Sequence, residues 1–128
     1  LLATTAVDGL DLSANGRQAR GCKGCHYDSW FALDKVAKVL FSGDVGAALL
    51  PAGEDGLFVD NFDKHIRHAE GFHRRWMGSN EAKRRWCERV SQMDIDMLCP
   101  QHGAIYQGAD VQRFINWFDG LQVGICGG

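Results

Sequence analysis

The sequence lacks any long apolar run and any strong excess of charge. Its hydrophobic stretches fall far short of the roughly 20 residues that a membrane-spanning helix needs. The formal net charge is −2, so composition offers no electrostatic case for a nucleic acid or a membrane surface as partner. We therefore expect a globular domain that binds neither a membrane nor a nucleic acid.

Several catalytic signatures are also missing. The chain contains no P-loop, no G-x-G-x-x-G, no G-x-S-x-G and no H-E-x-x-H pattern, and it shows no internal repeat. Residues 1–3 run directly into polar residues, unlike a secretory leader, and the chain starts without Met, as a fragment or a processed product would. Five cysteines are an odd number for a secreted disulfide scaffold, and Cys87 and Cys99 stand among apolar residues as buried thiols do. These features favour a reducing, cytoplasmic compartment.

Hydrophobic pattern divides the chain into three segments. Residues 1–25 are punctuated by glycine and show no sustained apolar period, so we expect a loop or a poorly packed end. Residues 26–124 carry regular patterns, and 125–128 are a tail. With 128 residues, 45% of them apolar, the chain is large enough for one domain with one core.

Two buried strands are predicted, each ending at a tight loop. The apolar, β-rich run over residues 36–41 ends at Ser42, Gly43 and Asp44, and a shorter run over 95–98 is stopped by Pro100. A loop over residues 101–103 follows the second strand. Strand ends in layered α/β folds are places where sites are built, because the sheet holds the loops rigidly.

Three helices are predicted from apolar residues that recur every three or four positions. The first covers residues 61–76, the second begins after the N-cap Ser79, and the third is capped by Asp110. The predicted order is therefore strand, helix, helix, strand, loop, helix. The residues expected to be mostly buried are Val39, Leu40, Phe41, Phe72, Trp76, Trp86, Leu98, Phe114 and Phe118.

Asp44 and His102 are the candidate metal ligands at the two strand ends. A carboxylate can bridge two cations, and a neutral imidazole is a suitable ligand for iron or zinc. Gly43 and Gly103 flank them and allow tight turns. Taken singly, each residue fits equally well as a turn-forming aspartate or an ordinary loop histidine.

Longer motifs carry a resemblance to a known family. They are residues 38–44 (KVLFSGD), 70–76 (EGFHRRW) and 94–106 (DIDMLCPQHGAIY), together with Ser79 and Asn80. Residues 30–124 resemble the C-terminal half of a metallo-β-lactamase-fold domain of the flavodiiron and oxygen-binding di-iron branch. The resemblance implies an α/β layered fold, an incomplete αββα sandwich, in which Asp44 bridges two metals and His102 binds one of them.

The resemblance also implies a function. It is that of a non-haem di-iron module that binds or reduces dioxygen or nitric oxide, and an oxidoreductase of flavodiiron type in the complete protein. Electrons would come from FMN on a flavodoxin-like partner domain or from a rubredoxin-like donor, and a homodimer is compatible with this function. The alternatives are a zinc-dependent hydrolase of the same fold, an oxygen sensor without turnover, a c-type electron carrier and a non-functional fragment.

Three interpretations of His26 stay open. The residues from His26 to Ser29 are similar to the family's His-x-x-Asp-Ser stretch, one residue shorter, which makes His26 a candidate third metal ligand. It also fits an ordinary loop residue. Finally, Cys22, Cys25 and His26 match the C-x-x-C-H pattern of c-type haem attachment, although we predict that haem is absent because the remaining motifs indicate another fold.

The family's H-x-E-x-D-H ligand cluster does not occur in the sequence. We therefore expect weak metal binding by this chain alone. If the two loops leave the same sheet edge, the Asp44 carboxylate and a His102 ring nitrogen should lie within roughly 3–6 Å of each other. For the helix-borne histidines, His65, His68 and His73, a packing or solvated role is favoured over a metal site, and the basic stretch over 64–89 is interpreted as a solvated face.

Overall fold

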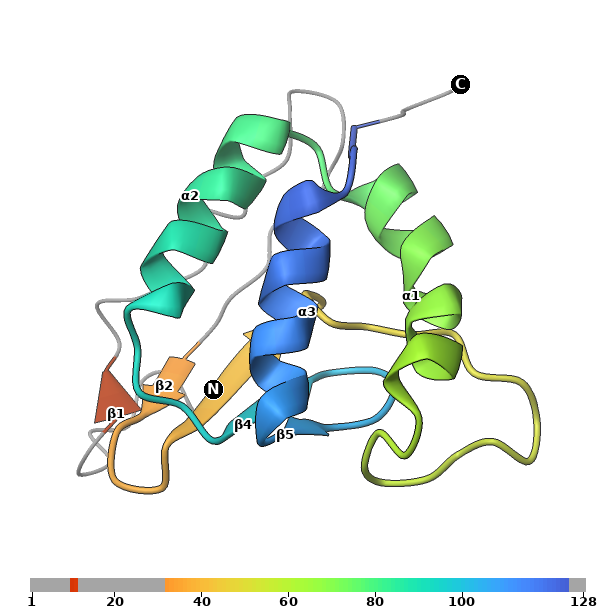
Figure 1. Ribbon diagram of the computed structural model, residues 1–128, viewed down its shortest axis with the longest axis horizontal. Coiled ribbons are helices and arrows are strands. Elements are labelled where there is room, and N and C mark those ends of the chain that lie inside the picture. The colour runs from red at the N-terminus through yellow and green to blue at the C-terminus, as the bar shows by residue number, and fades with distance from the viewer. Residues whose placement is uncertain (1–9, 12–31, 125–128) are drawn as a thin grey trace.

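A mixed five-stranded sheet carries three helices in the computed structural model, which describes residues 10–11 and 32–124 (Figure 1). In that view α3 runs between α2 and α1, in front of the sheet. The strands are β1 (Leu10–Asp11), β2 (Ala32–Asp34), β3 (Val39–Gly43), β4 (Met97–Pro100) and β5 (Tyr106–Gln107), and the helices are α1 (Phe62–Trp76), α2 (Asn80–Ser91) and α3 (Ala109–Gly120).

The parallel pairing of β3 with β4 determines which loops lie at the same edge of the sheet. The strands follow the order β1-β2-β3-β4-β5, and all neighbours are antiparallel except β3 and β4. The long connection between these two contains α1 and α2. Because β3 and β4 run in the same direction, the loops that follow them leave the same edge of the sheet.

Alternation along β3 corrects one burial prediction. Leu40 and Ser42 are fully buried, whereas Phe41 is 48% exposed. Successive side chains of a strand point to opposite faces, so Phe41 cannot share the core side with Leu40. The sequence run was interpreted as buried on both faces, and this was wrong for Phe41.

The hairpin before β3 explains why the strand starts later than predicted. The Asp34 carboxylate accepts hydrogen bonds from the backbone N–H groups of Val36 and Ala37, at 3.0 and 2.9 Å, and Lys38 adopts a φ of 57°. These contacts form a turn between β2 and β3 that leaves Val36 78% exposed. Strands β1, β2 and β5 have only two or three residues, too few for alternation to reveal them in the sequence.

Helix α1 buries a face that includes His65, Ile66, Ala69 and His73. Its N-cap is Asn61, whose side chain accepts from the Lys64 N–H, so the helix begins at Phe62, one residue after the predicted start.

The far end of α1 corrects a second burial prediction. Trp76 is the last helical residue and is 51% exposed. At Met77 the backbone turns to an extended conformation, and Met77 is buried where Trp76 was expected.

Helices α2 and α3 pack together and complete the core. Lys83 is buried on α2, and its ammonium group donates to the carbonyl of Asp119 near the C-terminal end of α3. The cap of α3 is Gly108 rather than the predicted Asp110, which instead pairs with Arg113. None of the described helices is long and apolar enough to cross a membrane. Fully buried core side chains include Leu40, Trp86, Leu98, Tyr106, Phe114 and Phe118.

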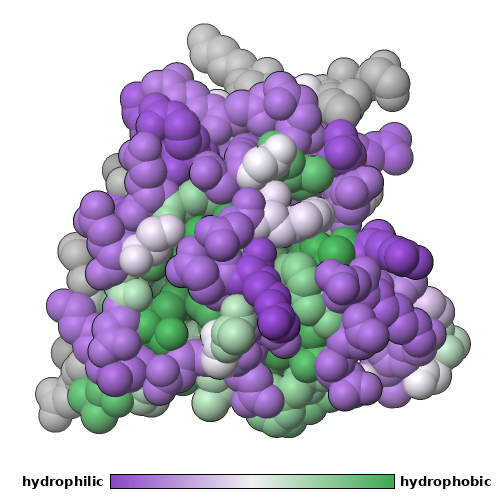
Figure 2. Space-filling view, in the orientation of Figure 1, coloured by the Kyte–Doolittle hydropathy of each residue, from purple (hydrophilic) through white to green (hydrophobic). Residues whose placement is uncertain are grey.

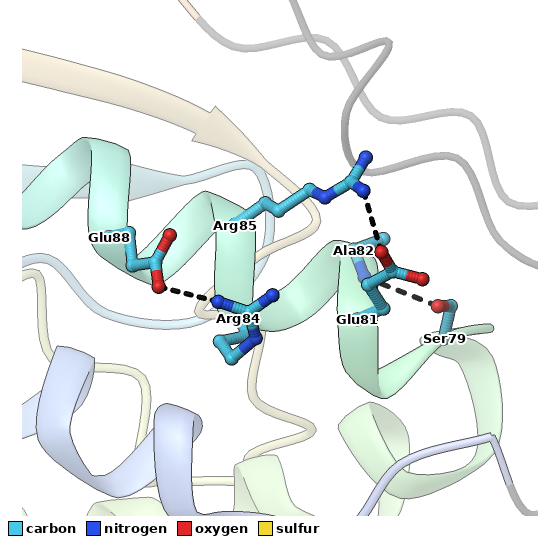
Figure 3. Close-up of polar contacts among 6 residues, drawn as sticks. All are labelled: Ser79, Glu81, Ala82, Arg84, Arg85 and Glu88. Atoms are coloured by element: carbon cyan, nitrogen blue, oxygen red, sulfur yellow. Dashed lines mark hydrogen bonds and ion pairs between the residues drawn. The ribbon is translucent and has the colours of Figure 1, made fainter.

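The outer surface of the helical layer is largely hydrophilic (Figure 2). On α2, Arg84 pairs with Glu88 and Arg85 with Glu81, each at 2.6 Å across one turn (Figure 3). The basic stretch is thus balanced by acidic neighbours, as expected for a solvated face.

The N-cap of α2 provides a first testable prediction. The Ser79 hydroxyl oxygen accepts from the Ala82 N–H at 3.2 Å (Figure 3). Replacing Ser79 by Ala should lower the free energy of unfolding by about 1 kcal/mol, because the cap is lost. The control Arg84→Ala removes only an exposed ion pair and should cost less than about 0.5 kcal/mol. Urea unfolding measures both, and equal losses would contradict the prediction.

Candidate metal centre

Asp44 and His102 meet at the sheet edge where β3 and β4 end. His102 Nε2 lies 3.9 Å from Asp44 Oδ1, within the predicted range, so the expected convergence is confirmed. The His102 side chain is 62% exposed and the Asp44 side chain is 31% exposed. The two groups, 58 positions apart in sequence, are therefore presented side by side at an accessible edge.

Backbone hydrogen bonds tie the two loops to each other. Gln101 N–H donates to the Gly43 carbonyl at 2.7 Å, and Ala48 N–H donates to the His102 carbonyl at 3.3 Å. Gly103 has a φ of +93°, and a Cβ there would lie 2.9 Å from Ala48 N. Only glycine fits this close approach, which explains the glycine beside the candidate ligand.

The turn that carries Asp44 is closed by its own hydrogen bonds. Val45 N–H donates to the Ser42 carbonyl at 3.2 Å, and Ala47 N–H donates to the Asp44 carbonyl at 3.1 Å. The buried Ser42 hydroxyl donates to the Val45 carbonyl at 2.6 Å. Asp44 thus lies within a structured turn.

Gly46 connects this turn to distant parts of the fold. Its N–H donates to His73 Nε2 at 2.9 Å, and its carbonyl accepts from the Tyr106 hydroxyl at 3.0 Å. The sequence pattern favoured a packing or solvated role for His73 and indicated no role for Tyr106. The position of His73 on the apolar stripe of α1 could have indicated this contact, because a buried polar side chain needs a hydrogen-bond partner.

Burial controls the ionisation of four titratable side chains in the fold. It lowers the pKa of His73 to about 4, although the Ala69 carbonyl opposes the shift, and it raises the pKa of Tyr106. It also raises the pKa of Cys87 to about 12, with the negative charge of Asp119 adding to the effect. These three groups are uncharged at neutral pH. Burial raises the pKa of Cys99 as well, although this thiol is only half-buried, less than predicted.

The other candidate ligands contribute no described site. Among the residues that the structure describes, no group of three or more His, Cys, Asp or Glu side chains could hold a metal ion. His65 and His68 line an open cavity of about 250 Å³ beside α1, and His68 Nε2 lies 3.7 Å from Glu54 Oε2. His26 and its neighbouring cysteines, Cys22 and Cys25, lie outside the described residues.

The donor types of the pair suit a metal such as iron. A carboxylate neutralises cationic charge and favours the hard ferric state, and an imidazole is a common ligand for iron and zinc. Two donors alone leave most coordination positions open. The pair fits part of a metal centre and does not complete one.

A family model described as "ODP family beta lactamase" matches residues 23–103. A comparison with curated protein sequences found no match.

Solved structures of a chemotaxis sensor are similar to this chain. The apo state of chemotaxis sensor ODP from T. denticola is 40% identical, with a TM-score of 0.72 over 79% of this chain and 42% of that chain. Another structure of the sensor ODP, also 40% identical, is described as its peroxy diiron species. The chain therefore spans about two fifths of the length of these sensor structures.

Two further solved structures are less similar in sequence. A flavoprotein from Thermotoga maritima is 25% identical, with a TM-score of 0.62 over 73% of this chain and 24% of that chain. Rubredoxin oxygen:oxidoreductase from Desulfovibrio gigas is 21% identical, with a TM-score of 0.63 over 72% of this chain and 24% of that chain. The latter likeness shows the fold alone.

Proposed function

The chain belongs to the ODP family of β-lactamase-like domains, and on this premise we propose that it forms part of a non-haem di-iron module that binds dioxygen. Its fold is the α/β layered metallo-β-lactamase type that the sequence resemblance predicted. The observation that carries the proposal is the 3.9 Å approach of His102 Nε2 to Asp44 Oδ1 at the ends of parallel strands.

In this proposal each residue has a distinct role. Asp44 would hold both irons through its carboxylate, whose negative charge would offset their repulsion, and His102 would bind one of them through an imidazole nitrogen. His26 is proposed as a third ligand. The bound iron would supply open coordination positions for a diatomic molecule, while the tied loops hold the two donors at one edge.

Binding and reduction are two forms of the function. The 40% identity to a chemotaxis sensor favours binding without turnover. Reduction of dioxygen or nitric oxide is the second candidate, and the likeness to a flavoprotein supports it, with FMN on a partner domain or a rubredoxin-like protein as electron donor. A stable spectral change on adding dioxygen to the reduced protein marks binding, whereas donor-dependent dioxygen consumption marks reduction.

Metal content tests the proposal directly. The test uses the full-length protein, including any residues encoded beyond these 128. Replacing Asp44 by Ala in it should remove most of the bound iron, because the bridging carboxylate is lost. The control Asp55→Ala changes an exposed residue in the loop over 51–58. Elemental analysis measures both. Unchanged iron in Asp44→Ala would overturn the proposal, and zinc in place of iron would favour the hydrolase alternative.

A further inference from the structure

We propose that His73 is a positioning residue for the metal centre, holding the turn that aims Asp44 by means of one fixed ring tautomer. The structural part of this inference rests on the contacts of the His73 ring. Its effect on metal affinity rests on the proposed function.

The contacts of the ring nitrogens define the tautomer. His73 Nδ1 lies 2.7 Å from the Ala69 carbonyl oxygen, which can only accept, so Nδ1 carries the proton. His73 Nε2 lies 2.9 Å from the Gly46 backbone nitrogen, which can only donate, so Nε2 carries no proton and accepts the hydrogen bond. The ring is therefore neutral, with its acceptor directed at the turn that contains Asp44.

Aromatic packing fixes the position of the ring. His73 is fully buried and meets four rings edge-on, with centroids 5.2 to 5.8 Å away; they belong to Phe72, Phe114, Trp117 and Phe118. Three of these rings come from α3, so the imidazole is held between two helices. The helical layer thereby sets the location of a hydrogen-bond acceptor at the sheet edge.

The fixed acceptor acts on Asp44 through Gly46. The Gly46 N–H is held by His73 and the Gly46 carbonyl by Tyr106, so this peptide segment is restrained on both sides. Ala47 N–H closes the same turn on the Asp44 carbonyl. Without the acceptor at Nε2, the buried Gly46 N–H would lack its partner, and the turn would rotate to find another. The Asp44 carboxylate would then lose its fixed direction toward His102.

The first experiment measures the turn without metal. His73→Phe retains an aromatic ring but removes the acceptor. The control Val90→Ala shortens a fully buried side chain of α2 that is neither one of the four rings around His73 nor a hydrogen-bond partner of Gly46. Hydrogen exchange by NMR should show the Gly46 amide losing at least about 10-fold protection in His73→Phe, relative to the core amide of Leu40. In Val90→Ala the ratio of the two amides should stay within about 2-fold. Equal ratios in the two variants would overturn the inference.

The second experiment measures metal affinity by anaerobic Fe²⁺ titration of the same full-length protein used for the metal-content test. His73→Phe should weaken Fe²⁺ binding by about 10- to 100-fold, as loss of a group that orients a ligand does, while Val90→Ala should stay within about 2-fold of wild type. Equal weakening by both variants would overturn the positioning role. If wild-type protein binds no Fe²⁺, the proposed function fails, and the Gly46 exchange result still decides the structural inference.

A conservative variant keeps the test decisive if His73→Phe does not fold. In His73→Gln the side-chain carbonyl can accept from the Gly46 N–H while the amide group donates to the Ala69 carbonyl. This variant should recover part of the Gly46 protection. Ring ¹⁵N chemical shifts of wild-type protein report the tautomer directly, and a proton on Nε2 would overturn the inference without any variant.

Discussion

Replacing Gly46 by Ala is expected to lower the free energy of unfolding by about 3–5 kcal/mol, the sum of backbone strain and overpacking. Gly46 has a φ of +98°, a conformation that alanine adopts only with strain. The added Cβ would lie 2.9 Å from Leu98 Cδ2 and 3.2 Å from Tyr106 Cε2. Both neighbours are fully buried and have little room to move, so the turn that carries Asp44 must shift instead.

Gly53 provides the matched control. It has a similar φ of +88°, but nothing lies within 4 Å of an added Cβ. Gly53→Ala should therefore cost only the conformational strain, about 1–2 kcal/mol. Urea unfolding of both variants separates strain from overpacking. Equal losses would show that Leu98 and Tyr106 yield to the methyl group and that Gly46 is not closely enclosed.

Acidification from pH 6.5 to pH 4 is expected to lower the free energy of unfolding by about 3 kcal/mol through His73 alone. Burial lowers its pKa from 6.5 to about 4 in the folded chain. Between these values the unfolded state binds a proton that the folded state does not. The stabilising contribution is therefore complete above about pH 6.5 and is lost as the pH falls through 4.

The surroundings of His73 support this direction. In the described part of the chain, the groups that contact the His73 ring are uncharged. They are the Ala69 carbonyl, the Gly46 N–H and aromatic rings from α1 and α3. Burial also lowers the pKa of His65, with the nearby His68 charge adding to the shift, so His65 acts in the same direction. Unfolding midpoints measured from pH 7 to 4 should decline less steeply in His73→Phe. An imidazole NMR titration of His73 centred near pH 6.5 would contradict the prediction.

Local sequence determined where the helices lie and which strand ends carry the candidate ligands. Ser79 caps α2 as predicted, because capping is an interaction between residues two or three positions apart. Asp44 and His102 were placed at strand ends from the apolar runs that precede them. Their convergence required one additional inference, that both loops leave the same edge of the sheet, and the parallel pairing of β3 and β4 meets it.

Tertiary structure decided which faces of the elements are buried and which residues hydrogen-bond to the turn that carries Asp44. Phe41 and Trp76 are apolar residues in predicted elements, yet both are about half exposed, because burial depends on which side the neighbouring layer covers. The partners of Gly46 lie 27 and 60 positions away, at His73 and Tyr106. No local period encodes such contacts, since they exist only once α1 and β5 have packed against the turn after β3.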